Sequence, residues 1–102
     1  MNFLQLKLMI MNNQPVNSET ITKKQIRELL LDFICRQFLV DKEDIEIDKS
    51  LIDQGIIDSM GLIEISTFMS QNFNFEVTVD QMTRQNFGSV LLMVGFIDKN
   101  KK

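Results

Sequence analysis

Apolar residues between positions 22 and 38 recur at the spacing of a helix. They lie three or four positions apart, so one face of a helix would carry all of them. They are Ile26, Leu29, Leu30, Phe33, Ile34 and Phe38. Thr22 followed by Gln25 fits a capping box, in which each side chain binds a free backbone N–H of the first turn. The pattern predicts an amphipathic helix over residues 22–38.

Two further long helices are indicated downstream. One begins at Asp58 or Ser59, either of which can cap it, and ends near Phe73. Its inward positions are Leu62, Ile65, Phe68, Met69 and Phe73. The other runs from about Gly88 to Lys99, and its inward positions are Val90, Leu91, Val94 and Ile97. Before it, an extended stretch leads into a short helical turn that Asp80 is expected to cap.

A long connection over residues 39–58 joins the first two helices. It is rich in isoleucine, so it must pack back onto the core, and we expect a helical turn at 50–53. Gly55 would supply a backbone turn that a Cβ disfavours. The chain is therefore predicted to be all-α, a four-helix bundle of three longer helices and one short helix, with a long loop between the first two.

The chain divides into a leader of residues 1–20, which we expect to be flexible, a folded domain of residues 21–99 and a tail of residues 100–102. The leader begins with an apolar run, but it lacks the basic start and small-residue cleavage site of a signal peptide. The run is also far too short to span a membrane. We therefore expect a cytoplasmic protein with no membrane span.

The composition excludes several classes of function. The 102 residues include no histidine and one cysteine, so there is no Ser-His-Asp or Cys-His pair and no histidine-based metal site. We therefore expect no enzyme activity. Cys35 lies beside the apolar face of the first helix and is interpreted as a small, buried or half-buried apolar residue. The net charge of −3 argues against nucleic-acid binding.

The acidic residues are concentrated in the middle of the chain. Residues 43–80 contain one lysine and nine acidic residues, a net charge of −8, whereas both flanking segments are mildly basic. Such a block is usually a solvated face, and it can also steer a basic partner.

The stretch that carries chemistry is Gly-Ile-Ile-Asp-Ser-Met at residues 55–60. It resembles the Gly-x-x-Asp-Ser-Leu signature of the acyl carrier protein family, with Met60 in place of the leucine. Further segments also resemble that family, so that the similarity covers about residues 22–98. They are residues 47–51 before the signature, residues 73–77 at the end of the second helix, and residues 86–90 and 96–97 of the last helix.

The resemblance implies that Ser59 receives a 4′-phosphopantetheine arm from coenzyme A, and that the arm holds acyl or aminoacyl groups as thioesters. It also implies that Asp58 helps a phosphopantetheinyl transferase and its Mg²⁺ engage the serine. By position, Met60, Ile63 and Glu64 should contact partner enzymes. The physical setting agrees, because a helix N-terminus favours a phosphate. Without a histidine, nothing in the chain could activate Ser59, so the base must come from the transferase.

The implied partners are the transferase, a loading enzyme (an adenylating ligase or an acyltransferase) and synthase or condensing enzymes, with the carrier itself a monomer. Three cargoes stay open: fatty or polyketide acyl groups, amino acids for a peptide synthetase, and D-alanine for teichoic acids. The sequence Gly-Ile-Ile-Asp-Ser-Met is similar to the signatures of carriers for the last two cargoes, amino acids and D-alanine. Only Glu64 is acidic between Ser59 and Phe73, which suggests a dedicated carrier that docks more by apolar contacts than by charge.

Some of these residues also have a purely structural interpretation. Asp58 could be a simple helix cap, and Met60 and Ile63 could complete the core. The alternative function is a helical adaptor that keeps the carrier fold but never bears the arm.

Overall fold

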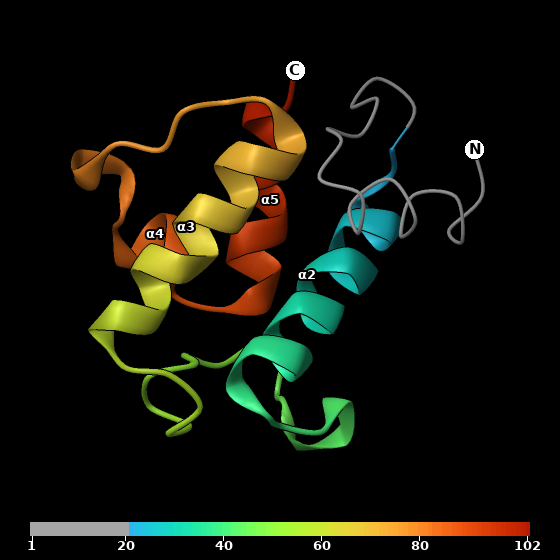
Figure 1. Ribbon diagram of the computed structural model, residues 1–102, viewed down its shortest axis with the longest axis vertical. Coiled ribbons are helices and arrows are strands. Elements are labelled where there is room, and N and C mark those ends of the chain that lie inside the picture. The colour runs from blue at the N-terminus through green and yellow to red at the C-terminus, as the bar shows by residue number, and fades with distance from the viewer. Residues whose placement is uncertain (1–20) are drawn as a thin grey trace.

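The computed structural model describes residues 21–102, and within that range all regular structure is helical. The elements are α2 (Lys23–Phe38), η2 (Lys42–Asp44), α3 (Ser59–Phe73), η3 (Val79–Gln81), α4 (Arg84–Phe87) and α5 (Val90–Asn100). Three longer helices and one short one form the expected all-α bundle (Figure 1). The predicted leader, residues 1–20, lies outside the described residues. No helix in residues 21–102 is long and apolar enough to cross a membrane.

The core lies between the long helices. In Figure 1, α3 passes in front of α5 while α2 lies to one side, and α5 packs against both α2 and α4. Phe33 of α2 stacks on Phe68 of α3 with ring centroids 4.3 Å apart. Phe87 of α4 lies 5.5 Å from Phe96 of α5. The first of these contacts joins α3 to α2, and the second joins α4 to α5.

The start of α2 confirms its predicted cap. The backbone N–H of Gln25 donates to the Thr22 hydroxyl at 3.2 Å, and the backbone N–H of Thr22 donates to Gln25 Oε1 at 2.9 Å. Ile26, Leu30 and Ile34 are fully buried, as expected of the apolar face.

The connection between α2 and α3 folds back onto the core. Ser50 C=O accepts the N–H of Gln54 at 3.0 Å, which closes the expected single helical turn, and Gly55 takes a φ of +76°. The Gln54 side chain holds the loop together: its Oε1 accepts the N–H of Glu46 and its Nε2 donates to the carbonyls of Glu46 and Lys49. These hydrogen bonds fix the conformation of the loop that leads to Asp58.

Two sequence-based predictions on the C-terminal side are wrong. Asp80 does not cap the short helix. Thr78 precedes η3 and its backbone N–H donates to Gln81 Oε1 at 2.9 Å, and Thr83 caps α4, so Asp80 lies inside η3. Thr78 is followed three residues later by Gln81, which is the spacing of a capping box, whereas the residue three positions after Asp80 is Thr83.

The other error is the inward face of α5. The helix begins at Val90 with Ser89 as its cap, and Leu91 is 45% exposed. Met93 and Phe96 are buried instead. Val90, Met93, Val94 and Ile97 have the i, i+3, i+4, i+7 spacing of a single face, and Leu91 lies off that face.

Candidate functional site

Ser59 is the first residue of α3 and is exposed to solvent. Asp58 precedes it with an extended backbone, and the Asp58 Oδ1 accepts the backbone N–H of Gly61 at 3.0 Å. The Ser59 hydroxyl makes no hydrogen bond to another described residue. The sequence prediction of a helix start with an aspartate cap and an accessible serine is confirmed.

Gly61 holds this helix start against the core, which sequence reasoning did not recognise. A Cβ at Gly61 would lie 2.8 Å from the Ile57 Cβ and 3.2 Å from the Phe38 ring. The sequence showed only that glycine weakens a first turn. The structure shows that the turn passes too close to Ile57 and Phe38 for a larger residue. The backbone that carries Ser59 is therefore fixed by the loop before it and by the end of α2.

The helix start suits a covalently attached phosphate group. The first-turn N–H groups of a helix carry partial positive charge and lack intrahelical partners. Apart from the Asp58 cap, the first turn of α3 contains no acidic residue that would repel an anion. An exposed hydroxyl next to these N–H groups can hold a phosphodiester that extends into solvent. The residues present therefore fit a phosphate-linked arm on Ser59.

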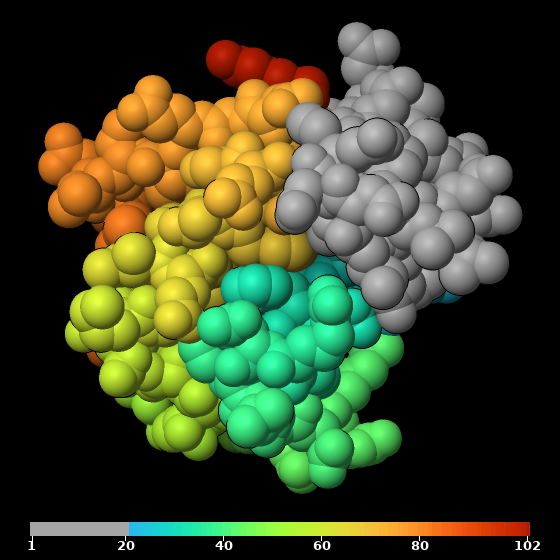
Figure 2. All heavy atoms as spheres, in the orientation of Figure 1, coloured from blue at the N-terminus to red at the C-terminus, as the bar shows by residue number. Residues whose placement is uncertain are grey.

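The three residues predicted to contact partners lie on the solvent side of α3. Met60 is 63% exposed and Ile63 is 50% exposed, so neither completes the core. Glu64 is exposed and its Oε2 accepts a hydrogen bond of 3.4 Å from the Gln37 side chain of α2. The space-filling view shows the yellow surface of α3 open to solvent beside the blue-green surface of α2 (Figure 2). Two exposed apolar side chains on one helix are suited to contact another protein.

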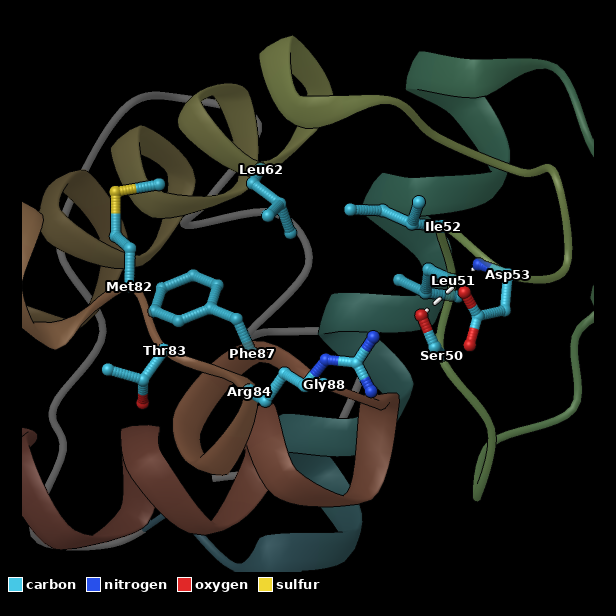
Figure 3. A pocket seen from close by; sticks show the side chains of 10 residues that line it. All are labelled: Ser50, Leu51, Ile52, Asp53, Leu62, Met82, Thr83, Arg84, Phe87 and Gly88. Atoms are coloured by element: carbon cyan, nitrogen blue, oxygen red, sulfur yellow. Dashed lines mark hydrogen bonds between the residues drawn. The ribbon is translucent and has the colours of Figure 1, made fainter.

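A small cavity opens near the start of α3, and no sequence signal pointed to it. Its volume is about 150 Å³ (Figure 3). Leu62, one helical turn after Ser59, lies on one side of it together with Met82 and Phe87, while Arg84 reaches across toward Ser50. The cavity forms only where the loop at 50–53, α3 and α4 meet, so its residues come from three separate segments.

Two other kinds of reactive site, a nucleophilic thiol and a metal site, were considered in the described part of the chain. Burial raises the pKa of the Cys35 thiol, and the carboxylate of Asp32 raises it further, so the thiol stays protonated and is a poor nucleophile. The half-buried position of Cys35 confirms its interpretation as a packing residue. Residues 21–102 contain no cluster of side chains that could hold a metal ion.

Comparison with known families places the site in context. The family described as "Phosphopantetheine attachment site" matches residues 28–97, more than half of the chain. The chain belongs to this family. Its prosthetic group is therefore a covalently attached 4′-phosphopantetheine, and its role is that of a phosphopantetheine carrier.

Curated relatives include D-alanyl carrier proteins of Streptococcus pyogenes serotype M5 (strain Manfredo), serotype M49 (strain NZ131) and serotype M1. Each is 26% identical over 74 residues, which cover 72% of this chain and 92% of the relative. No solved structure matches the chain. The relatives are similar in length to the matched part of this chain, so a single carrier domain accounts for the similarity.

Proposed function

We propose that Ser59 is the residue that bears the phosphopantetheine arm. The observation that carries this proposal is the exposed Ser59 hydroxyl at the first position of α3, directly after the capping Asp58. Both residues lie inside the segment that matches the phosphopantetheine-attachment family. Once attached, the arm supplies a terminal thiol that holds cargo as a thioester.

The attachment step uses coenzyme A as donor. The Ser59 Oγ attacks the phosphorus next to the pantetheine, a new P–O bond forms, and the bond from that phosphorus to the bridging pyrophosphate oxygen breaks. The adenosine bisphosphate half of coenzyme A leaves, and the hydroxyl proton goes to a base. The chain has no histidine, so this base belongs to a phosphopantetheinyl transferase. The chain is thus a substrate of that enzyme and not itself a catalyst. Modification takes place in the cytoplasm, where coenzyme A is available.

Asp58 has two compatible roles in this step. Its Oδ1 caps α3 through the N–H of Gly61, which fixes the backbone on which Ser59 lies. Its carboxylate is exposed, so it can also approach the Mg²⁺ of the transferase. Met60, Ile63 and Glu64 extend the same exposed surface along α3 and are the residues on which we expect the transferase and the loading and condensing enzymes to dock.

The cargo we propose first is a small amino acid, with D-alanine as the leading candidate. Support comes from the D-alanyl carrier proteins among the relatives and from α3, where Glu64 is the only acidic residue. A carrier of this kind is loaded by an adenylating ligase. Fatty or polyketide acyl groups are the competing cargo, and an acyltransferase would load them.

Intact mass tests the attachment site. The full chain is incubated with a broad-specificity phosphopantetheinyl transferase, Mg²⁺ and coenzyme A, alongside Ser59→Ala and Ser66→Ala. Ser66 is a matched control because it lies on the same helix and its hydroxyl donates only to the Ile63 carbonyl. We expect the wild type and Ser66→Ala to gain one phosphopantetheine and Ser59→Ala to gain none. No gain in the wild type would favour the unmodified adaptor, and a gain in Ser59→Ala would assign the arm to another residue.

Loading of the modified protein tests the cargo. The holo form is given ATP and a D-alanine-adenylating ligase with D-alanine or L-alanine, and in parallel an acyltransferase with acyl-coenzyme A. We expect a mass gain of one alanyl group with D-alanine, and its loss on treatment with hydroxylamine, which cleaves thioesters. Efficient acyl loading without alanyl loading would overturn the cargo and leave the attachment site intact.

A further inference from the structure

One side of α5 is apolar and open to solvent. Leu91 is 45% exposed and Leu92 is 46% exposed, although the sequence predicted Leu91 to be buried. Gly95 follows one turn later, and a Cβ there would meet nothing within 4 Å, so the fold of the chain itself does not require a glycine. Leu92, Gly95 and the exposed Lys99 share one side of the helix because they are spaced i, i+3, i+7. We refer to Leu91, Leu92 and Gly95 as the α5 strip.

The two ends of the α5 strip carry opposite charge. At its start, the N–H of Leu91 donates to the Ile47 carbonyl at 3.0 Å, which brings the acidic loop against the first turn. Asp48 and Asp53 lie with Leu92 around a groove of about 320 Å³, where Arg84 is the one positive group. At its end lies Lys99, about 10 Å along the helix from Leu92.

Lys99 and Lys102 have no ion-pair partner among the described residues, and Lys99 is the one that shares a side of α5 with Leu92. Lys101 nearby is already paired with Asp98, at 2.6 Å between its Nζ and the Asp98 Oδ1. The strip therefore runs from a net negative end to a positive end. A copy of the same strip, turned through 180°, is its charge complement.

We propose that the α5 strip is a self-association surface on which a second copy of this chain packs with its α5 antiparallel. Two-fold symmetry then places Lys99 of each copy opposite Asp48 of the other, so the same ion pair forms twice. The leucines of the two copies meet between these pairs, and the absence of a side chain at Gly95 lets the helices approach closely.

The small size of the α5 strip makes this association weak. Two half-exposed leucines per copy cover far less than the roughly 800 Å² per partner that a stable complex buries. The dimer is therefore transient and depends on concentration, whereas the sequence predicted a monomer. Ser59 lies on α3 and outside the strip, so this inference does not depend on the proposed function.

Sedimentation velocity of the full chain over about 10 μM to about 1 mM tests the proposal. The samples contain a reductant, so that Cys35 cannot form a disulfide between copies. The variants are Leu92→Glu, Lys99→Glu, Asp48→Lys, the double variant Asp48→Lys/Lys99→Glu, and Lys23→Glu. Lys23 is the matched control because it is an exposed lysine on α2 and does not belong to the strip.

We expect the sedimentation coefficient of the wild type and Lys23→Glu to rise with concentration and that of Leu92→Glu to stay at the monomer value. Each single charge reversal should weaken association about three- to tenfold, and the double variant should recover most of it, because the reversed pair is again complementary. Circular dichroism establishes whether the variants are folded. If Leu92→Glu is unfolded, the charge-reversal variants alone test the proposed dimer. A wild type that stays monomeric over the whole concentration range overturns the proposal. The strip would then be the docking surface of a different protein. Association that Leu92→Glu and both charge reversals leave unchanged also overturns the proposal.

Discussion

The Asp58 carboxylate and the backbone N–H of Gly61 are joined by a hydrogen bond of 3.0 Å across the first turn of α3. Ser59 lies inside the turn that this bond closes. The bond ties the proposed attachment residue to a glycine that is itself packed against Ile57 and Phe38. Ser59 therefore lies exposed in a capped first turn that packs closely against the core at Gly61.

Substitution of Asp58 separates its two roles. Asp58→Asn keeps an oxygen that can accept the Gly61 N–H, so the free energy of unfolding should change by only a few tenths of a kcal/mol, whereas Asp58→Ala should lose about 1 kcal/mol. Both remove the carboxylate, so the rate of phosphopantetheine transfer should fall in both. Urea denaturation and the initial rate of mass gain measure the two effects. If Asp58→Asn were modified as fast as the wild type, Asp58 would be a helix cap and nothing more.

Gly61→Ala should destabilise the protein although alanine favours helices. The added Cβ would meet the stiff, β-branched Ile57 at 2.8 Å, and overpacking of this kind costs about 1–3 kcal/mol, against a helix-propensity gain of at most about 1 kcal/mol. Gly95→Ala is the matched control, because its Cβ meets nothing within 4 Å. At low protein concentration it should raise the free energy of unfolding by up to about 1 kcal/mol. Equal changes in the two variants would refute the close packing at Gly61.

Met60→Glu and Ile63→Glu should impair contacts with partner enzymes without unfolding the protein. Both side chains are at least half exposed, so each change should alter the free energy of unfolding by about 0.5 kcal/mol or less. The kcat/KM of the loading enzyme should fall about tenfold or more, because a charge would replace an apolar contact at the interface. Val79→Glu, at a position in η3 that is 85% exposed, should leave kcat/KM unchanged. A similar loss in all three variants would point to net charge and not to a docking surface.

The ion pair between Glu28 and Lys42 should make stability depend on pH. The Lys42 ammonium, 2.7 Å from Glu28 Oε2, lowers the pKa of that carboxyl below 4.5. A carboxyl whose pKa is lower in the folded state stabilises the fold above its unfolded pKa and loses that contribution as pH falls through its folded pKa. Glu28→Gln should therefore be less stable than the wild type at pH 7, by up to about 1 kcal/mol for a partly exposed pair. The difference should shrink below pH 4.5, as urea denaturation across pH would show.

The sequence by itself determined the features that depend on neighbours within one or two turns. The capping box of Thr22 and Gln25 and the cap at Asp58 involve residues three positions apart, so their partners are visible in the chain. The apolar face of α2 has the same local origin, and so does the placing of Ser59 at a helix start. The turn at Gly55 follows from glycine's tolerance of a positive φ.

The tertiary structure decided which faces are covered and which segments meet. Leu91 was predicted to lie inward with its apolar neighbours on the last helix, yet its exposure depends on how α5 lies against α2 and α4. Gly61 shows its importance only when Ile57 and Phe38 are placed beside it. The cavity next to α3 needs the loop at 50–53 and α4 to converge. Contacts between residues far apart in the chain depend on the packing of whole helices, which no local pattern encodes.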